Sequence, residues 1–138
     1  MIKELLNGIY KALERSDIPL MASDTKEPKS RPGLKIYVKP KTSSINADVR
    51  LTTYEIMILY YASNIYDYYL EQYDIIEEFE EMILGSVELS NGVFVDFDKL
   101  EFETDDDLLV VYIETTVDSK VDSEIDDEIM EELKLTLE

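Results

Sequence analysis

One long apolar segment limits the possible folds more than any other part of the sequence. Residues 49–62 read VRLTTYEIMILYYA. As far as Thr53 the residues alternate between the two sides of a strand, and from Ile56 to Tyr61 both sides are apolar. A strand that is apolar on both sides is typical of the centre of a sheet with a cover on each face. The sequence therefore predicts a sheet with this segment inside it.

Other segments supply partners for that strand. Strand patterns recur at residues 34–39, at 93–98 with 100–103 as a continuation or a short break, and at 108–117. Pro40 should end the first of these, because proline cannot continue a hydrogen-bond ladder, so that residues 40–47 form an exposed loop. Residues 24–33 contain two prolines and a glycine and predict a second loop.

Two helices are expected to pack on the sheet. Apolar residues recur at helical spacing over residues 2–15 and over residues 65–84. In the second helix the apolar stripe consists of Ile65, Tyr69, Tyr73, Ile76, Phe79 and Ile83. From Val117 onwards apolar residues recur at every fourth position, which fits helix or strand, and the composition of residues 124–134 favours a short helix.

These elements together predict the fold class. We expect residues 1–138 to form one α+β domain. Its sheet should be antiparallel or mixed, with about four strands. The N-terminal helix and the long central helix should pack on that sheet, and a short C-terminal helix is an additional expectation.

Residues 60–74, YYASNIYDYYLEQYD, hold six tyrosines. Tyr60 and Tyr61 end the predicted central strand, and Tyr69 and Tyr73 lie on the predicted stripe of the long helix, so we expect these four to pack in the core. The tyrosines at positions 66 and 68 lie off that stripe. Aromatic residues outside the core are enriched at protein–protein contacts, so Tyr66 and Tyr68 are candidates for contact with another subunit.

Charge is distributed unevenly along a chain whose net charge is −19. Residues 26–50 carry seven basic and two acidic side chains, whereas residues 51–138 carry three basic and twenty-six acidic ones. One interpretation is a loop kept soluble by lysines. The other is head-to-tail contact between copies, basic end to acidic surface. The basic candidates for that contact are Lys29, Arg31, Lys35, Lys39, Lys41 and Arg50.

Several functions are disfavoured by the same composition. A chain this acidic repels nucleic acid and anionic membranes, and no apolar run is long enough to span a bilayer. The sequence has no histidine and no cysteine, which removes the commonest general base and the strongest nucleophile. Asp96 and Asp98 form a close pair, but such pairs arise by chance in an acidic chain. We therefore expect no enzymatic activity and no catalytic, cofactor-binding or metal-binding residues.

The order of elements resembles a known family. A helix MIKELLNGIYKALE precedes the hairpin GLKIYVKP…VRLTTYEIMILYY, an acidic helix ending IIEEFEEMIL, two strands and a terminal IMEELKLTLE. This order resembles the tail terminator, or tail completion, proteins of phages and phage tail-like particles of Gram-positive bacteria. The resemblance implies no cofactor. Transferred by position, it makes residues 24–33 and 40–47, with Lys35, Lys39 and Arg50, candidate contacts to the tail tube or to a neighbouring subunit.

The same resemblance implies a structural role in a particle. It implies a ring, of six copies, at the head-proximal end of the tail tube, which ends growth of the tube and joins the tail to neck or collar proteins. In a contractile tail the ring would also touch the sheath. The protein would be assembled in the bacterial cytoplasm and reside in a virion or in a headless bacteriocin particle; the sequence leaves open which, and whether the tail contracts.

Two other classes remain open from the residues alone. Rows of carboxylates imitate the phosphates of DNA, so an acidic mimic that binds and inhibits a DNA-binding protein is the alternative function. A different small structural or adaptor protein is the third class.

Overall fold

The structure is a computed structural model that describes residues 1–20 and 31–120. In these ranges the elements are two α-helices, one short 3₁₀ helix and six strands. Their bounds are α1 Ile2–Leu13, η1 Glu14–Ser16, β1 Gly33–Asn46, β2 Val49–Tyr61, α2 Tyr69–Ile83, β3 Gly85–Glu88, β4 Phe94–Phe97, β5 Leu100–Asp105 and β6 Leu108–Lys120. The predicted N-terminal helix is confirmed, whereas the expected helix over residues 124–134 lies outside the described ranges.

Four of the described strands form one antiparallel sheet in the order β1-β2-β6-β5, and β3 pairs with β4 in a separate two-stranded sheet. β2 has a partner on each side along its whole length, since Val49 pairs with Asn46 and Lys120 and Tyr61 pairs with Gly33 and Leu108. The prediction that residues 49–62 form a central strand is confirmed. The α+β class with a sheet of about four strands is confirmed as well.

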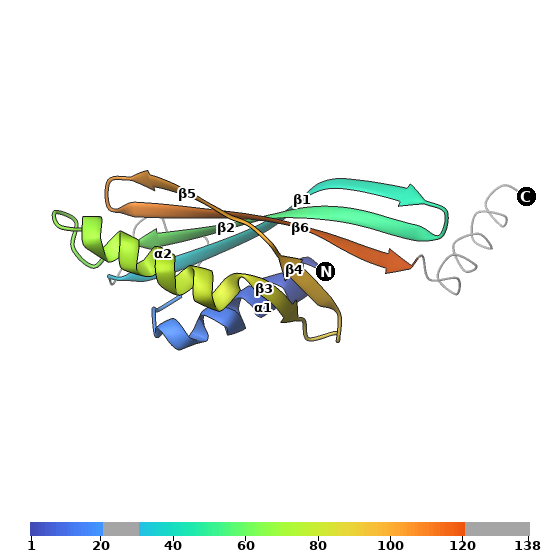
Figure 1. The fold of residues 1–138 in the computed structure, drawn as a ribbon, viewed down its shortest axis with the longest axis horizontal. Helices are drawn as coiled ribbons and strands as arrows, with labels where there is room; N and C mark the ends of the chain where they lie inside the picture. Colours follow the sequence, from blue (N-terminus) through green and yellow to red (C-terminus); the bar gives the residue numbers. More distant parts are fainter. Residues whose placement is uncertain (21–30, 121–138) are drawn as a thin grey trace, which may run out of the picture.

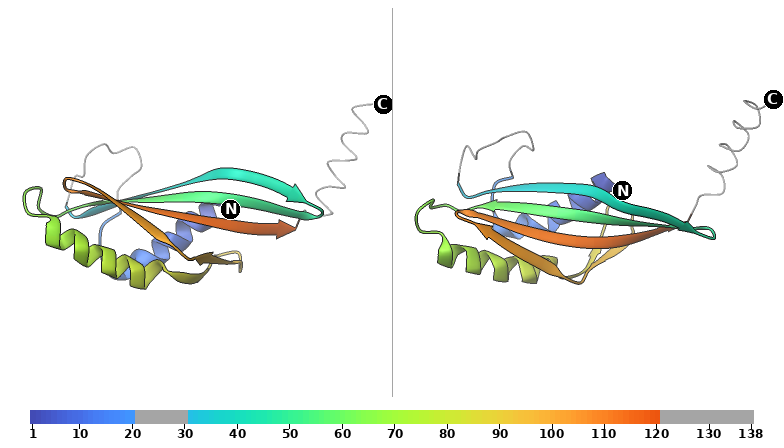
Figure 2. Two further views of the ribbon diagram at one scale, coloured as in Figure 1. Left: turned by 45° about the horizontal axis from the view of Figure 1, so that its top comes forward. Right: turned by 90° about the horizontal axis from the view of Figure 1, so that it is seen from above.

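Both helices lie on one face of the sheet (Figures 1 and 2). Leu5 and Ile9 of α1 and Phe79 of α2 are fully buried there, as are Ile56 and Ile58 of β2. This is the hydrophobic core of the domain. Fully burying a side chain of this size contributes about 1.5–3 kcal/mol, so the apolar face of β2 is a main source of stability.

The face of the sheet away from the helices is partly buried in the part of the chain that the structure describes. On the face away from the helices Met57 and Leu59 are half-buried rather than buried. Met57 pairs across the sheet with Tyr37 and Tyr112, whose long side chains shield it. Lys35 and Val110, which pair with Leu59 from its two sides, are buried on this face, so the expected cover on each face stays a prediction.

The expectation that Pro40 ends the first strand is also wrong. β1 continues to Asn46, with a shift in register between Pro40 and Thr42. β1 is an edge strand, and an edge position or a bulge tolerates the missing N–H of proline. Residues 40–47 are therefore not a loop but the end of a long hairpin, which turns at Ala47 in the left-handed conformation (φ 56°).

Because of this hairpin, part of the sheet extends beyond the helices. We call residues 41–53 and 114–120, from β1, β2 and β6, the β-arm (Figure 1). In β1 every residue from Lys39 to Asn46 is exposed. The β-arm and the amino-terminal end of α2 lie at opposite ends of an elongated molecule (Figure 1).

The long helix begins later and faces differently than the sequence predicts. α2 starts at Tyr69, and its buried residues are Gln72, Ile75, Phe79 and Ile83. The prediction that Tyr69 and Tyr73 pack in the core is wrong, since they are 63% and 53% exposed. The buried amide of Gln72 donates a hydrogen bond of 2.9 Å to the carbonyl of Asp106 and takes the inward position in their place.

The remaining tyrosines of the stretch divide between core and surface. Tyr60 is buried, as predicted, and Tyr61 is half-buried. Tyr68 packs against the core, although its position off the predicted stripe indicated a surface site. Tyr66 is 88% exposed, as expected for a residue outside the core.

Candidate protein-binding surfaces

The basic residues singled out in the sequence do not form one continuous patch. Arg31, directly before β1, pairs with Asp107 in the turn between β5 and β6. Its guanidinium also donates a hydrogen bond of 3.0 Å to the carbonyl of Ala62. These contacts fasten the start of β1 to the ends of β2 and β5.

Lys35 is the one predicted contact residue that is buried among those described. It is 4% exposed, and its ammonium lies 5.8 Å from the centroid of the Tyr61 ring. This distance is within the range of a cation–π interaction. A side chain held in this way contributes to the fold of the monomer.

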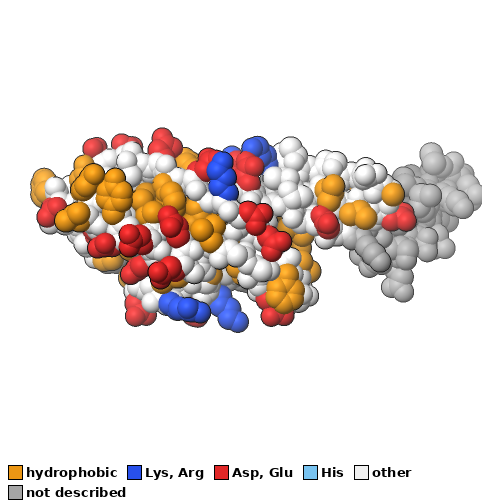
Figure 3. Space-filling view, in the orientation of Figure 1, with side chains coloured by type: hydrophobic (Ala, Val, Ile, Leu, Met, Phe, Trp, Pro, Cys, Tyr) orange, Lys and Arg blue, Asp and Glu red, His pale blue; other side chains and the backbone are white. Residues whose placement is uncertain are grey.

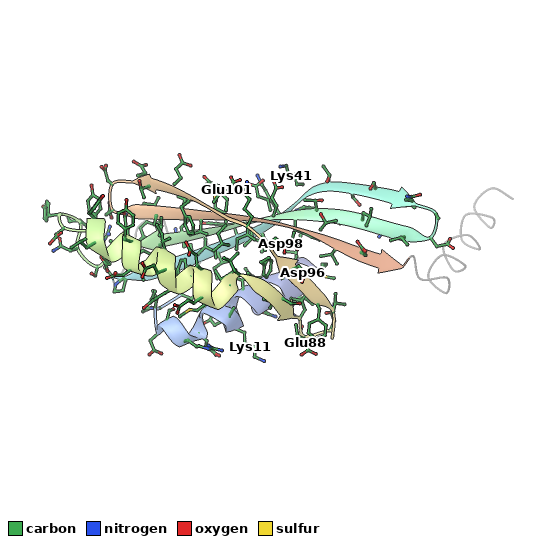
Figure 4. All side chains as sticks on the ribbon, in the orientation of Figure 1. Lys11, Lys41, Glu88, Asp96, Asp98 and Glu101 are labelled. Atoms are coloured by element: carbon green, nitrogen blue, oxygen red, sulfur yellow. The ribbon has the colours of Figure 1, made fainter. Side chains whose placement is uncertain are left out.

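Lys39 and Lys41 belong to an ionic cluster on the face of the sheet opposite the helices (Figure 4). The ammonium of Lys39 is 3.9 Å from a carboxylate oxygen of Glu55, and Lys41 pairs with Glu114. The hydrogen bond to Glu114 raises the pKa of Lys41. Lys41, Glu55 and Glu114 line a hollow of about 290 Å³ together with Glu101 and other polar side chains.

Arg50 lies exposed on the β-arm, where it pairs in register with Ile45. Among the residues described it has no ion pair. Lys29 lies outside the described ranges. Whether any of these six basic residues contacts another subunit stays a prediction.

Exposed aromatic and apolar side chains gather at the amino-terminal end of α2. Ile65, Tyr66, Tyr69, Leu70 and Tyr73 form this group, which we call the aromatic end (Figure 3). Their exposed fractions run from 46% to 88%. Large exposed apolar patches on a folded protein mark interaction sites, and aromatic residues are enriched at them.

The two helical tyrosines of the aromatic end hold each other in place. Tyr69 and Tyr73 are one helical turn apart, and their ring centroids are 4.9 Å apart in an edge-to-face arrangement. The hydroxyl of Tyr69 donates a hydrogen bond of 3.4 Å to that of Tyr73. This pair is an ordered and exposed aromatic surface.

Glu71 fastens the aromatic end to the sheet. Its carboxylate accepts hydrogen bonds from the Tyr60 hydroxyl (2.8 Å), from the Ser63 hydroxyl (2.7 Å) and from the Ser63 N–H (3.1 Å). Burial by itself would raise the pKa of Glu71, but the hydrogen bonds from Ser63 and Tyr60 outweigh it, so the pKa is lowered. Burial and the bond to Glu71 raise the pKa of Tyr60.

A second surface lies where β4 passes the end of β6. There the structure forms a groove of about 510 Å³, which we call the β6 groove. Its acidic lining residues are Asp96, Asp98, Glu114 and Asp118. Phe94, which is 65% exposed, adds an aromatic ring, and the hydroxyl of Thr115 donates a 3.0 Å hydrogen bond to the carbonyl of Asp96. Figure 4 shows Asp96 and Asp98 beside β4.

Sequence reasoning missed three residues of these surfaces. Leu70 is one of the most exposed apolar side chains, and Ile45 and Phe94 are 63% and 65% exposed. The signal for Ile45 was present, because it is the one apolar residue larger than alanine in the polar stretch KTSSINA. Phe94 and Leu70 carried no such signal, since each fits an ordinary apolar pattern.

The described part of the chain shows no arrangement for metal chemistry. Across residues 1–20 and 31–120 no three acidic, histidine or cysteine side chains come together as metal ligands. In the same ranges neither helix is long and apolar enough to cross a membrane. These surfaces are candidate contact areas. The aromatic end is apolar, and the β6 groove is acidic and lined by strands.

Fold and surfaces together define a small α+β domain with exposed contact areas at its two ends. The model of the family described as "Phage tail terminator protein" matches residues 4–133, nearly the whole chain. The chain therefore belongs to the phage tail terminator family, which confirms the resemblance noted in the sequence. No individually curated protein matches the chain. Membership makes it a structural protein of phage tails, associated with other tail proteins in the virion.

Proposed function

We propose that six copies of this protein form a ring at the head-proximal end of the tail tube. The ring ends growth of the tube and joins the tail to neck or collar proteins; in a contractile tail it also meets the last ring of the sheath. The observation that carries the proposal is the family match over residues 4–133. A protein that terminates a tube needs contacts to its own copies and to the tube, and no chemistry.

The shape of the molecule supports this role. The aromatic end and the β-arm lie at opposite ends of the domain (Figure 1), so one copy can contact different neighbours through each. Two different surfaces on one chain allow head-to-tail association, which closes into a ring when the rotation between copies permits. In the proposed ring the exposed residues Lys39, Arg50 and Tyr66 remain candidate contacts.

The direct test is the size and symmetry of the purified protein. Light scattering should give the mass of six subunits, and negative-stain class averages should show sixfold rings. Added during polymerisation of the tail tube protein, the rings should sit at tube ends and shorten the tubes. A monomer that leaves tube length unchanged at high protein concentration would refute the proposal.

Two variants and a matched control locate the contact. Tyr66→Ser and Leu70→Ser remove exposed side chains from the aromatic end, and Tyr10→Ser removes one from α1, where Tyr10 is 45% exposed. We expect the first two to reduce ring formation or tube capping at least tenfold, and the Tyr10 variant to behave as wild type. Equal behaviour of all three would exclude the aromatic end as a contact surface.

A further inference from the structure

Two strand edges of the β-arm lie open, one on each side. The sheet order places β1 at one edge, so the outer side of residues 42–46 has no partner strand among the described residues. β5 begins at Leu100, which pairs with Ile113, so among the described strands β6 beyond Ile113 also lacks a partner on that side. Open strand edges present unpaired N–H and C=O groups and are templates for pairing with another chain.

The hairpin turns show which backbone groups point outward. The two-residue turn after Asn46 is closed by the pair Asn46–Val49, which exchanges hydrogen bonds in such a hairpin. Because bonded and non-bonded pairs alternate along an antiparallel ladder, Ser43 and Ile45 direct their N–H and C=O groups away from β2.

The same alternation applies on the other side of the β-arm. The turn between β5 and β6 is closed by the pair Asp105–Leu108. Even-numbered residues of β6 therefore face the β5 side, and beyond the start of β5 these are Glu114, Thr116 and Asp118. No backbone hydrogen bond to these three from outside the sheet occurs within the described ranges.

The edge of β1 is protected in its middle and unprotected at its end. Lysine, proline and bulges are the features by which natural sheets prevent edge pairing, and Lys39, Pro40 and the register shift before Thr42 supply all three. From Thr42 to Asn46 the edge has none of them. This free length of five residues is comparable to the free length of β6 from Glu114 to Lys120.

We propose that the free edge of β1 in one copy pairs with the free edge of β6 in the next copy, so that one continuous sheet joins neighbouring subunits. The occupant of the β6 groove is thus a second copy of this chain. The inference rests on the proposed ring and says how its subunits are joined. Pairing of an added strand to an open edge gives affinity through main-chain hydrogen bonds and specificity through side chains.

Charge disfavours one of the two symmetric alternatives. The free edge of β1, residues 42–46, carries no charged side chain, and of the lysines before it Lys35 is buried and Lys41 pairs with Glu114. The β6 groove is lined by four carboxylates, at Asp96, Asp98, Glu114 and Asp118. Pairing of β6 with a second β6 would bring these carboxylates together, which is unfavourable, whereas the uncharged free edge of β1 meets no such repulsion. Charge therefore disfavours pairing of β6 with β6, and single-cysteine variants test pairing of β1 with β1.

Strand direction agrees with a ring. Within one sheet β1 and β6 are each antiparallel to β2 and hence parallel to each other. Copies related by a rotation around a ring keep this relation, so β1 and β6 of neighbours would pair in parallel. Ile45 lies on the same side of the sheet as Val117, which lines the β6 groove with Phe94. A neighbour's Ile45 would supply the apolar contact for Phe94 there.

The absence of cysteine from the sequence gives a clean test by disulfide cross-linking. Ser44 and Thr116 point to the same face of the sheet, and within one copy they are separated by the width of β2, too far for a disulfide. Mild oxidation of the double variant Ser44→Cys/Thr116→Cys should give a series of covalent oligomers up to the size of the ring. Ser44→Cys/Asp118→Cys tests the same contact with the strands shifted by two residues. Ser44→Cys/Ser119→Cys, with its second cysteine on the opposite face, is the matched control and should give at least tenfold less product.

Each outcome decides between the alternatives. Wild-type rings together with this series of oligomers support the inference. Wild-type rings with no such series in either double variant overturn it and leave the proposed ring standing. Covalent dimers from Ser44→Cys alone or Thr116→Cys alone indicate symmetric pairing and also overturn it. A wild-type protein that forms no ring refutes the proposed function, whatever the cross-linking shows.

A proline variant checks the backbone contact independently. Ser43→Pro removes an N–H that points outward, so the ladder to β2 keeps its bonds and the melting temperature of the monomer should change little. Ring formation should fall at least tenfold. Unchanged assembly with an unchanged fold would contradict pairing through this edge.

Discussion

The hydrogen bond between Tyr60 and Glu71 allows a quantitative prediction about what holds the aromatic end in position. Tyr60 is 1% exposed, and its hydroxyl donates a 2.8 Å hydrogen bond to the carboxylate of Glu71. Tyr60→Phe removes the hydroxyl and leaves the ring, which packs edge to face against Phe79. The substitution therefore isolates one hydrogen bond between β2 and α2.

The expected loss follows from the partners that remain. A hydrogen bond to a charged group contributes about 1.5–3 kcal/mol. After Tyr60→Phe the carboxylate of Glu71 still accepts from the N–H and the hydroxyl of Ser63, so the lower limit applies. We expect a decrease of about 1.5 kcal/mol in the free energy of unfolding, which is a decrease in melting temperature of about 5 °C.

Removing the acceptor should cost more than removing the donor. Glu71→Ala leaves the Tyr60 hydroxyl without a partner at a buried site and also releases Ser63, so we expect a loss of about 3 kcal/mol. In the double variant the buried hydroxyl is gone, and its stability should be no lower than that of Glu71→Ala alone. Urea unfolding at neutral pH, at dilutions where the protein is monomeric, measures all three.

The outcome that would refute this reasoning is additivity. If the losses of Tyr60→Phe and Glu71→Ala add in the double variant, the two side chains do not interact. A loss below about 0.5 kcal/mol for Tyr60→Phe would have the same meaning.

The stability that the Tyr60–Glu71 pair contributes depends on pH. The pKa of Glu71 is lowered in the folded protein, so the carboxylate contributes stability above its unfolded pKa of about 4.3. That contribution is lost as the pH falls through the lower folded pKa. The difference in free energy of unfolding between wild type and Tyr60→Phe should have its full size at pH 7 and shrink below about pH 4. A difference that grows in acid would contradict the assignment.

Further substitutions test the core and the buried lysine by thermal unfolding. A Cβ at Gly8 would lie 2.7 Å from the side chain of Leu89. Gly8→Ala should therefore lower the free energy of unfolding by about 1–2 kcal/mol, although alanine favours a helix more than glycine does. In a Leu89→Ala background, which removes the clash, Gly8→Ala should have no effect on stability. Phe97 is 1% exposed, so Phe97→Ala should lower the free energy of unfolding by about 3–5 kcal/mol. Lys35→Glu should destabilise the monomer, because it places a carboxylate at a 4% exposed site beside Tyr61, whereas Lys35→Met should be tolerated.

Patterns that depend on local chemistry predicted the fold well. The central position of β2 followed from apolar residues on both of its sides, and the start of α1 from helical spacing. The end of β1 did not follow, because whether a proline stops a strand depends on whether that strand lies at an edge. Edge position is a property of the whole sheet and is invisible in the residues around Pro40.

The buried face of α2 was predicted wrongly for a related reason. Tyrosine is both aromatic and polar, so Tyr69 and Tyr73 fit an inward and an outward stripe equally well. The choice was decided by Gln72, whose amide is buried because a distant carbonyl, that of Asp106, accepts its hydrogen bond. Such a pairing between residues far apart in the chain leaves no periodic signal.

The surfaces show the same limit. Composition identified a basic segment, but the partners of its side chains depend on strand register. The pairing of β1, β2 and β6 brings Lys41 to Glu114, and the end of the sheet brings Arg31 to Asp107. Much of the positive charge that indicated contact between subunits is thus balanced within one subunit. Long-range attraction between a basic end and an acidic surface is correspondingly weaker than the sequence implies.

This balance changes what must hold the proposed ring together. Each subunit carries a net charge of −19, so copies repel one another at long range. Attraction must then come from contacts that act at short range, and the β-arm offers unpaired backbone groups together with the exposed Ile45 and Phe94. The charges that remain act on specificity: carboxylates around the β6 groove disfavour a second acidic edge and do not repel the uncharged free edge of β1. In the proposed ring, repulsion between two acidic β6 edges is thus one reason why β6 pairs with a different strand of the next copy.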